Sequence, residues 1–339
     1  MNKPTAAPNR GSIGRWLLIL LAVVVGSTLL ATGLVMYCAP ERPAVAPAPP
    51  APPPDTTRLV QAAMRNVNYR VDPDVVMRIR YLIGFLVPTH EDSMPVFDRP
   101  ESFNIRITSA EIALDTASLS QMLNRYVFGY RGAPIRDLRI SVEGDHLKQR
   151  GKLGTLPFTI LATIAVTDNG LIRLHPVDVK VLGINADGLM SKLGIELDDM
   201  VKVRRGGGIR VDENDFLLDP AAIIPAPRIV GTLKHVRLTP GAVVLQFGPP
   251  DSLAARSYFG GTEPAVNYMS FAGARLRFGK LTMNGTDMFI VDPDPADPFD
   301  FMLSRYHEQL VAGHHRTTPE DGLVVWMPDF GESGLRTED

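Results

Sequence analysis

Residues 156–184 read LPFTILATIAVTDNGLIRLHPVDVKVLGI, two long apolar stretches separated by Asp168-Asn169-Gly170. Asn-Gly between alternating apolar residues is the strongest short-range signal of a turn between antiparallel strands. The stretch therefore predicts a hairpin of two strands, Phe158–Val166 and Leu171–Leu182.

Apolar and polar residues also alternate outside this hairpin, which is typical of strands with one buried face. In one predicted strand, one face holds Met77, Ile79, Tyr81, Ile83 and Phe85, and the other holds Arg78 and Arg80. Further strands are predicted over Phe103–Leu114 and Leu138–Val142, and a second hairpin over Leu276–Met283 and Met288–Val291, around Asn284-Gly285. Long antiparallel strands joined by tight turns are expected to form most of the structure.

Three segments instead have the spacing of an amphipathic helix. Ser118–Phe128 has a stripe of Leu119, Met122, Leu123, Tyr126 and Val127 and stops at Gly129. Ala186–Val203 has Leu189, Leu193, Leu197 and Met200 on one face. Asp297-Pro298 predicts the start of a third helix, with a stripe of Phe299, Leu303, Tyr306 and Leu310. Few helices among many strands predict an α+β fold, a curved antiparallel sheet with helices packed on one side.

An unbroken apolar run precedes these elements at residues 16–37, WLLILLAVVVGSTLLATGLVMY. As a helix it reaches roughly 33 Å, enough to cross a hydrocarbon core of about 30 Å. Basic residues precede it, and the nearest charges after it, Glu41 and Arg42, cancel. Residues 1–15 are therefore predicted to be cytoplasmic and the main domain periplasmic, with the run as an uncleaved inner-membrane anchor. A cleaved signal peptide and lipidation of Cys38 are the alternatives.

Residues 38–54 form a Pro/Ala-rich linker, whose composition favours an extended, semi-rigid stalk of up to about 50 Å. Residues 1–54 hold four basic residues and one acidic residue, which leaves 31 basic and 36 acidic residues in the rest of the chain. This net charge of −5 argues against nucleic-acid binding. We divide the rest into a β-rich domain, residues 55–250, and a C-terminal hairpin-and-helix segment, residues 251–339, expected to pack on it.

The segment from Ser109 to Gly248 has a recognisable order of motifs. It runs AEIALD, SLSQMLNRYVFG, LRISVEGDHLKQRGKL, the pair LPFTILATIAVTDNGLIRLHPVDVKVLGI, DGLMSKLGIELDDMVKV, IRVDENDFLLDP and PRIVGTLKHVRLTPGAVVLQFG. This order resembles the LmeA-like phospholipid-binding family of bacterial envelope proteins, related to the tubular lipid-binding (TULIP) superfamily. The resemblance implies a sheet wrapped around one or two helices, a groove for acyl chains, and a function in binding, transferring or presenting lipid.

The candidate lipid site is the helix predicted over residues 186–203 and the chain just after it. The predicted lipid-binding residues are Leu189, Leu193, Leu197, Met200, Lys202, Arg204 and Arg205. The four apolar residues are candidates for the wall of the groove, although such stripes are also common in ordinary cores. The three cations suit an anionic phospholipid head group, and a solvated helix end is the alternative interpretation.

Signals for catalysis or metal binding are weak. Four carboxylates lie close together at Asp292, Asp294, Asp297 and Asp300, which suits Ca²⁺, but the spacing lacks the glycine and the final glutamate of an EF-hand. Two of these aspartates also suit the start of the predicted third helix. No HExxH, G-x-S-x-G or phosphate-loop motif occurs. We therefore predict no metal, no cofactor and no enzymatic activity.

We therefore predict a single-pass, membrane-anchored lipid-binding protein whose partner is membrane lipid. This prediction combines the anchor, the linker, the β-rich domain and the family resemblance. The alternative is a structural or assembly module of the envelope. Such a module would bind another envelope protein through an exposed sheet edge in the C-terminal segment.

Overall fold

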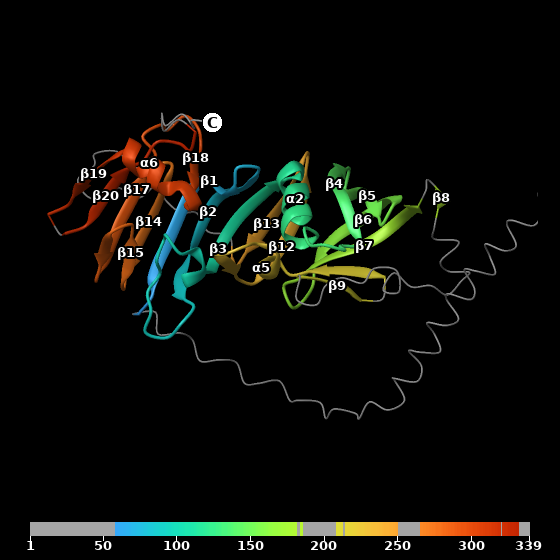
Figure 1. Cartoon of the computed structure of the whole chain (residues 1–339), viewed down its shortest axis with the longest axis horizontal. Helices are drawn as coiled ribbons and strands as arrows, with labels where there is room; N and C mark the ends of the chain where they lie inside the picture. The colour runs from blue at the N-terminus through green and yellow to red at the C-terminus, as the bar shows by residue number, and fades with distance from the viewer. Residues whose placement is uncertain are drawn as a thin grey trace, which may run out of the picture. The chain divides into compact units, whose positions relative to one another are not determined.

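Three long strands open the described part of the chain. β1 (Val60–Asp72), β2 (Val75–Pro88) and β3 (Phe103–Asp115) form an antiparallel meander, and they lie side by side in Figure 1. In the first half of β2, the buried residues Met77 and Ile79 alternate with the exposed Arg78 and Arg80. The strand predicted from Met77 to Phe85 and the strand predicted over Phe103–Leu114 are therefore confirmed as β2 and β3.

The prediction that Ile83 and Phe85 share the buried face of Met77 is wrong. From Ile79 to Tyr81 the pairing advances two residues in β2 and one residue in β3, so β2 carries an extra residue there. An extra residue exchanges the two faces of a strand, because side chains alternate with a period of two. Beyond it the fully buried side chains are those of Leu82 and Leu86, whereas Ile83 and Phe85 are half-buried.

These strands belong to an eleven-stranded sheet with the order β12-β13-β3-β2-β1-β14-β17-β20-β19, in which β11 also pairs with β3 and β18 with β1. Most pairs are antiparallel, but β1·β18, β3·β11 and β17·β20 are parallel. The remaining strands of this sheet are β11 (Arg228–Val230), β12 (Leu233–Thr239), β13 (Ala242–Phe247), β14 (Tyr268–Gly273), β17 (Thr286–Val291), β18 (Phe299–Met302), β19 (His314–Thr317) and β20 (Leu323–Trp326).

A second sheet has seven strands in the order β4-β5-β6-β7-β10-β9, with β8 beside β7. Its strands are β4 (Ile135–Glu143), β5 (His146–Leu153), β6 (Leu156–Val166), β7 (Ile172–Val181), β8 (Ile184–Asn185), β9 (Ile209–Asp212) and β10 (Asp215–Leu218). The hairpin predicted around Asp168-Asn169-Gly170 is confirmed, since β6 and β7 pair antiparallel on both sides of it. Gly170 has a φ of 76°, a left-handed conformation that glycine adopts without strain.

The helix predicted over Ser118–Phe128 is confirmed as α2 (Thr116–Met122), which continues into a π-helical turn, η3 (Leu123–Val127). The helix starts earlier than predicted because Asp115 caps it. The backbone N–H of Ser118 donates to the Asp115 carboxylate at 2.7 Å. Two further short helices are η2 (Pro100–Ser102) and α5 (Pro220–Ile223).

The helix predicted after Asp297-Pro298 is wrong over its first turn. Residues 299–302 form β18, which pairs in parallel with β1, and they bury the rings of Phe299 and Phe301. Helical structure begins only at η4 (Leu303–Arg305) and continues as α6 (Tyr306–Ala312). The apolar spacing of this segment suits a strand as well as a helix, and pairing with β1 decides between them.

The hairpin predicted around Asn284-Gly285 is also wrong. β15 (Leu276–Phe278) instead pairs with β16 (Leu281–Met283), so the chain reverses at Gly279, where φ is 58°. The residues after Asn284-Gly285 belong to β17, which pairs with β14 and β20 in the larger sheet. With the turn at Gly279, Leu276 and Phe278 are buried in the core.

This computed structural model describes residues 58–181, 184–185, 208–212, 214–249, 265–319 and 321–331. All of them belong to one compact unit, Asp55–Asp339. They are mostly β-sheet with few helices, and the strands curl into a half-barrel (Figure 1). None of their helices is long and apolar enough to cross a bilayer. The predicted anchor (16–37), linker (38–54) and helix (186–203) lie outside the described residues.

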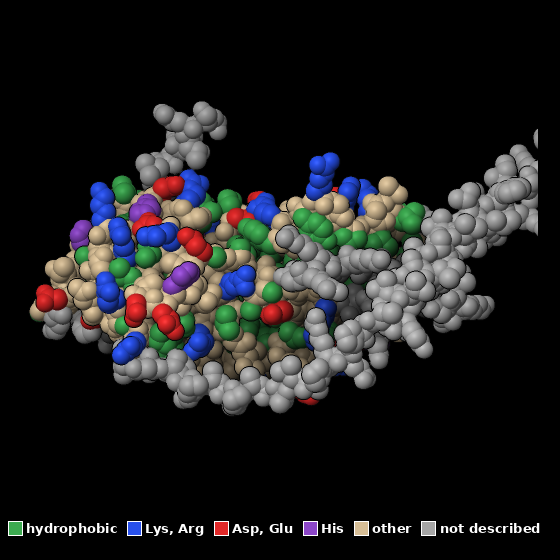
Figure 2. Space-filling model, turned by 60° about the horizontal axis from the view of Figure 1, so that its bottom comes forward, with side chains coloured by type: hydrophobic (Ala, Val, Ile, Leu, Met, Phe, Trp, Pro, Cys, Tyr) green, Lys and Arg blue, Asp and Glu red, His purple; other side chains and the backbone are tan. Residues whose placement is uncertain are grey.

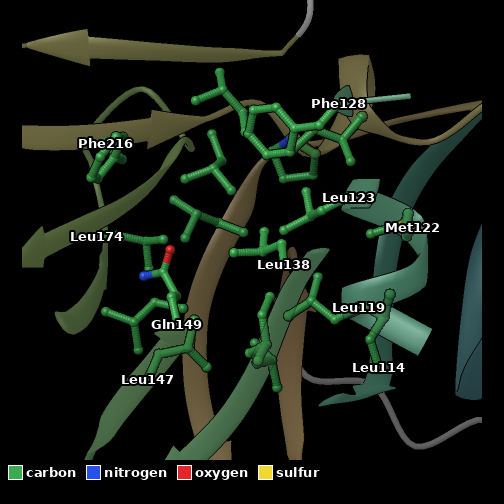
Figure 3. A pocket seen from close by; sticks show the side chains of 18 of the residues that line it. Leu114, Leu119, Met122, Leu123, Phe128, Leu138, Leu147, Gln149, Leu174 and Phe216 are labelled. Atoms are coloured by element: carbon green, nitrogen blue, oxygen red, sulfur yellow. The ribbon is translucent and has the colours of Figure 1, made fainter. Parts of the chain in front are cut away.

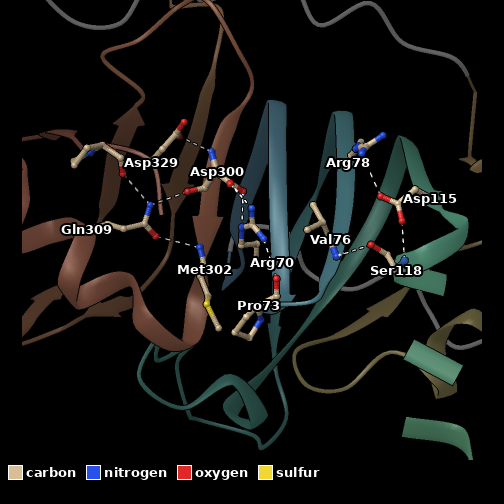
Figure 4. A network of polar contacts seen from close by, with 11 residues as sticks. Arg70, Pro73, Val76, Arg78, Asp115, Ser118, Asp300, Met302, Gln309 and Asp329 are labelled. Carbon is tan, nitrogen blue, oxygen red and sulfur yellow. Dashed lines mark hydrogen bonds and ion pairs between the residues drawn. The ribbon is translucent and has the colours of Figure 1, made fainter. Parts of the chain in front are cut away.

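Polar contacts join the C-terminal elements to the start of the larger sheet (Figure 4). Arg70 of β1 donates two hydrogen bonds to the Asp300 carboxylate, at 2.8 and 2.5 Å. Gln309 of α6 is fully buried, and its Oε1 accepts from Met302 N at 3.1 Å. Its Nε2 donates to the carbonyl oxygens of Asp300 and Pro328, at 2.8 and 2.9 Å. Gln309 therefore satisfies three backbone groups at once.

We expect Gln309→Leu to lower the free energy of unfolding by about 2–3 kcal/mol, because each buried group left without a partner costs about 1–3 kcal/mol and relaxation recovers part of the loss. Urea denaturation of residues 55–339 measures the change. Gln121→Leu, at an exposed site on α2, is the control and should stay within about 0.5 kcal/mol of the unsubstituted protein. Equal effects of the two substitutions would contradict the role given to Gln309.

Candidate functional site

An apolar cavity of about 90 Å³ lies where the smaller sheet, α2 and two strands of the larger sheet meet. Figure 3 shows Leu119 and Met122 on one side of it, with Leu174 and Phe216 on the other. Of the 23 described residues that line it, 22 are apolar, and the remaining one is Gln149. The cavity is therefore built to exclude water and to favour hydrocarbon.

Strand alternation forms the wall on the side of the smaller sheet. In β7, Ile172 and Leu174 line the cavity, while Arg173 and His175 are exposed on the other face. The same period of two places Phe158 and other apolar residues of β6 in the lining. One face of this sheet is therefore apolar and covered, and the opposite face is polar.

The other walls come from segments distant in the sequence. α2 and η3 contribute Leu119, Met122 and Leu123, which lie on one face of the helix because residues three and four apart are neighbours. β13 of the larger sheet contributes Val243 and Leu245. The cavity thus exists only where the two sheets and the helix pack together.

Gln149 is the one polar residue in the described part of this lining. It follows Leu147 on the inward face of β5, and Figure 3 shows its amide pointing among the side chains of Leu147 and Leu174. The Nε2 atom is buried and has no hydrogen-bond partner in the described part of the chain. A buried N–H without a partner is costly, about 1–3 kcal/mol, so this amide is an unusual feature of the site.

The cavity volume sets the size of a guest. A water-sized group needs about 10–15 Å³, so there is room for roughly six to nine groups of that size, such as methylenes. Each buried methylene contributes about 0.8 kcal/mol, or roughly 5–7 kcal/mol in total before ordering costs. Typical small-molecule pockets are larger, about 300–1,000 Å³. The cavity as it stands therefore fits a segment of one acyl chain and not a whole phospholipid.

The outer face of the same sheet is cationic. Figure 2 shows Lys and Arg side chains projecting from the region that β4 and β5 occupy in Figure 1. Arg139 of β4 lies directly opposite Arg150 of β5, and Arg136 lies opposite Lys152. Like charges in such positions repel each other. Among the described residues, the three arginines have no ion-pair partner, so this face is suited to bind an anion.

The one acid among these cations is Asp137. Lys152 Nζ donates to it at 2.8 Å, and this hydrogen bond, helped by the charges of Lys152, Arg139 and Arg136, lowers the pKa of the carboxyl group. Among the described residues, only Lys152 is in ion-pair contact with this carboxylate, and the arginines act on it through their charge at longer range. The cluster of Arg136, Asp137, Arg139, Arg150 and Lys152 keeps a net positive charge.

Titratable groups elsewhere hold the fold together. Burial acts to raise the pKa of Asp98, but hydrogen bonds from His307 and Tyr306 lower it overall. Burial raises the pKa of Asp292 to about 6, and Asn267 contacts its carboxylate. Of the aspartates considered for Ca²⁺, Asp300 is engaged by Arg70. In the described ranges, no group of three or more His, Cys, Asp or Glu residues is placed to hold a metal.

The predicted lipid-binding residues cannot be placed beside the cavity. Leu189, Leu193, Leu197, Met200, Lys202, Arg204 and Arg205 all lie outside the described residues. The residues of β4 to β7 that line the cavity were missed as a site, although the alternation of β4, β6 and β7 was recognised. The signal that could have found them is a polar residue, Gln149, at an inward position of an otherwise apolar series.

No protein-family model, curated protein or solved structure matches this chain. Its class is therefore defined by the fold and the site. Its described part is rich in β-strands and has few helices, and the two sheets, α2 and α5 together line an apolar cavity.

Proposed function

We propose that this chain is a membrane-anchored lipid-binding protein of the bacterial envelope and that an acyl chain occupies the apolar cavity. The observation that carries the proposal is the lining, in which 22 of the 23 residues that the structure describes are apolar. Water is held poorly in such a space, whereas hydrocarbon gains the full benefit of burial. Binding is passive and involves no chemical reaction.

Features of the sequence support the proposed location of the protein. The apolar run at residues 16–37 anchors the chain in the inner membrane, and the linker at 38–54 holds the β-rich unit in the periplasm close to lipid. In this proposal the curled sheet wraps α2 and the helix predicted over 186–203, as the resemblance to the LmeA-like family implies. Membrane lipid is then both the surroundings of the protein and the source of its ligand.

Native mass spectrometry of residues 55–339, the compact unit that contains every described strand, tests the proposal. We expect a co-purifying lipid that solvent extraction removes, followed by saturable uptake of a fluorescent fatty acid with one molecule bound per chain. A protein that carries no lipid and takes up no fatty acid would refute the proposal.

The cationic cluster on β4 and β5 predicts a salt-dependent contact with anionic lipid. A cation near an anionic membrane surface contributes about 1 kcal/mol, so Arg139→Ala is expected to weaken binding of residues 55–339 to phosphatidylglycerol vesicles about fivefold at low ionic strength. Physiological salt should reduce the difference, because the screening length is then about 8 Å.

Vesicle co-sedimentation measures this binding, and Arg316→Ala is the matched control. Arg316 is exposed on β19 and contributes the same charge, but Figure 1 shows β19 at the opposite end from β4. Equal losses from both substitutions would mean that net charge, and not the cluster, governs binding to the vesicle.

Assembly with another envelope protein is the second candidate function. β20 lies between β17 and β19, so β19 is the edge of the larger sheet among the described residues. All four residues of β19 are exposed, and an edge strand offers backbone groups to an added strand. Site-specific crosslinking from His315 that captures one stoichiometric protein, in the absence of any lipid uptake, would favour this function over lipid binding.

A further inference from the structure

The cavity contains one feature that hydrocarbon alone does not explain, the amide of Gln149. Three successive inward positions of β5 are Leu147, Gln149 and Gly151, and the first two line the cavity. A leucine at the middle position would complete the apolar wall. Gln149 instead places a buried Nε2 atom, without a hydrogen-bond partner among the described residues, against an otherwise apolar space.

Water is a poor partner for this amide. A buried water is held by two to four polar groups in a site that is itself polar. Among the described residues of the lining, Gln149 is the only one with a polar side chain, so a water there would have a single side-chain partner and apolar neighbours among them. An oxygen atom carried by a bound hydrocarbon chain avoids this problem, because burial of the rest of the chain holds it in place.

We infer that the acyl chain bound in this cavity carries an oxygen function, and that Gln149 recognises it. The inference rests on the proposed function and specifies its ligand class: a chain with a hydroxyl, keto or ester oxygen. A hydroxyl group suits the site best, because it both donates and accepts and so complements the amide in either orientation.

The surroundings of Gln149 place that oxygen within the hydrocarbon part of the ligand. Apolar residues from α2, β7 and β10 line the cavity around the amide, and Figure 3 shows Leu174, Leu147 and Leu138 near it. A charged head group would lose its hydration there without compensation. A single neutral oxygen, flanked by methylenes on the chain, matches one amide in an apolar wall.

Displacement of a fluorescent fatty acid from the full chain in detergent micelles tests the inference. The competitors are palmitic acid and a series of hydroxypalmitic acids that differ in hydroxyl position. We expect one isomer to bind about tenfold more tightly than palmitic acid, the effect of pairing one buried group. Gln149→Leu should remove this preference, and Gln61→Leu, at an exposed site on β1, should retain it.

Each outcome of this experiment bears on a different claim. Equal preference in the unsubstituted protein and in Gln149→Leu would overturn the inference while leaving lipid binding in place. Failure of every fatty acid to displace the probe would overturn the proposed function as well. Thermal unfolding gives a readout that needs no ligand: Gln149→Leu should raise the melting temperature, since it removes a buried N–H group that has no hydrogen-bond partner among the described residues. An unchanged melting temperature would mean that the amide is already satisfied, and this too would overturn the inference.

Discussion

Leu174→Trp is expected to weaken acyl-chain uptake by roughly 10- to 60-fold, because the indole occupies space that two or three methylenes would fill. Each displaced methylene forfeits about 0.8 kcal/mol of burial, and about 1.4 kcal/mol corresponds to a factor of ten. Leu174 is buried on the inward face of β7 and contributes to the cavity wall. Titration of residues 55–339 with a fluorescent fatty acid measures the change.

Leu156→Trp is the matched control for this substitution. Leu156 lies in β6 of the same sheet but is 43% exposed, and it does not line the cavity. The Leu174 variant should unfold at a somewhat lower temperature, since overpacking a core costs about 1–3 kcal/mol, and Leu174→Phe should give an intermediate loss of uptake. Undiminished uptake by a folded Leu174→Trp protein would show that the ligand binds elsewhere.

Phe97→Ala is expected to lower the free energy of unfolding by about 3–5 kcal/mol, the usual cost of removing a buried phenylalanine ring. Phe97 is 3% exposed and lies in the segment between β2 and η2. Its ring contacts four others, whose centroids lie 5.2–6.0 Å away: Phe103, Phe271, Phe278 and Tyr306. One side chain therefore joins β3, β14, β15 and α6.

Chemical denaturation measures this loss of stability, with circular dichroism and tryptophan fluorescence as the two probes. Trp326 of β20 contributes to the fluorescence. Both probes should give one coincident transition in the unsubstituted protein and in Phe97→Ala, because the strands of the C-terminal segment lie in the same sheet as β1. Phe97→Leu, which keeps most of the volume, should cost much less. Separate transitions would show that the C-terminal segment unfolds independently.

Local signals in the sequence were sufficient for several elements. The hairpin of β6 and β7 was predictable because a tight turn and two alternating stretches agree with each other. The helix around Ser118 was predictable because its apolar stripe and the glycine at its end agree, whereas its start at Thr116 depends on the cap at Asp115, which was not predicted.

Elements were mispredicted where tertiary contacts decide between local alternatives. Residues 299–302 suit a strand or a helix, and the parallel pairing of β18 with β1 selects the strand. The extra residue after Ile79 cannot be recognised from the composition of the segment, yet beyond it the side chains of β2 exchange faces. The cavity was not predictable for the same reason, since its walls come from segments as distant as Leu114 and Leu245.

The most direct measurement for the central claim is photocrosslinking of the full chain with a fatty acid that carries a diazirine in its acyl chain, followed by mapping of the labelled peptides. The account predicts labels on the residues that line the cavity, in α2, β6 and β7, and their loss when unlabelled fatty acid competes. Labels confined to the outer face of the sheets or to residues 16–37, with none in the cavity, would contradict it.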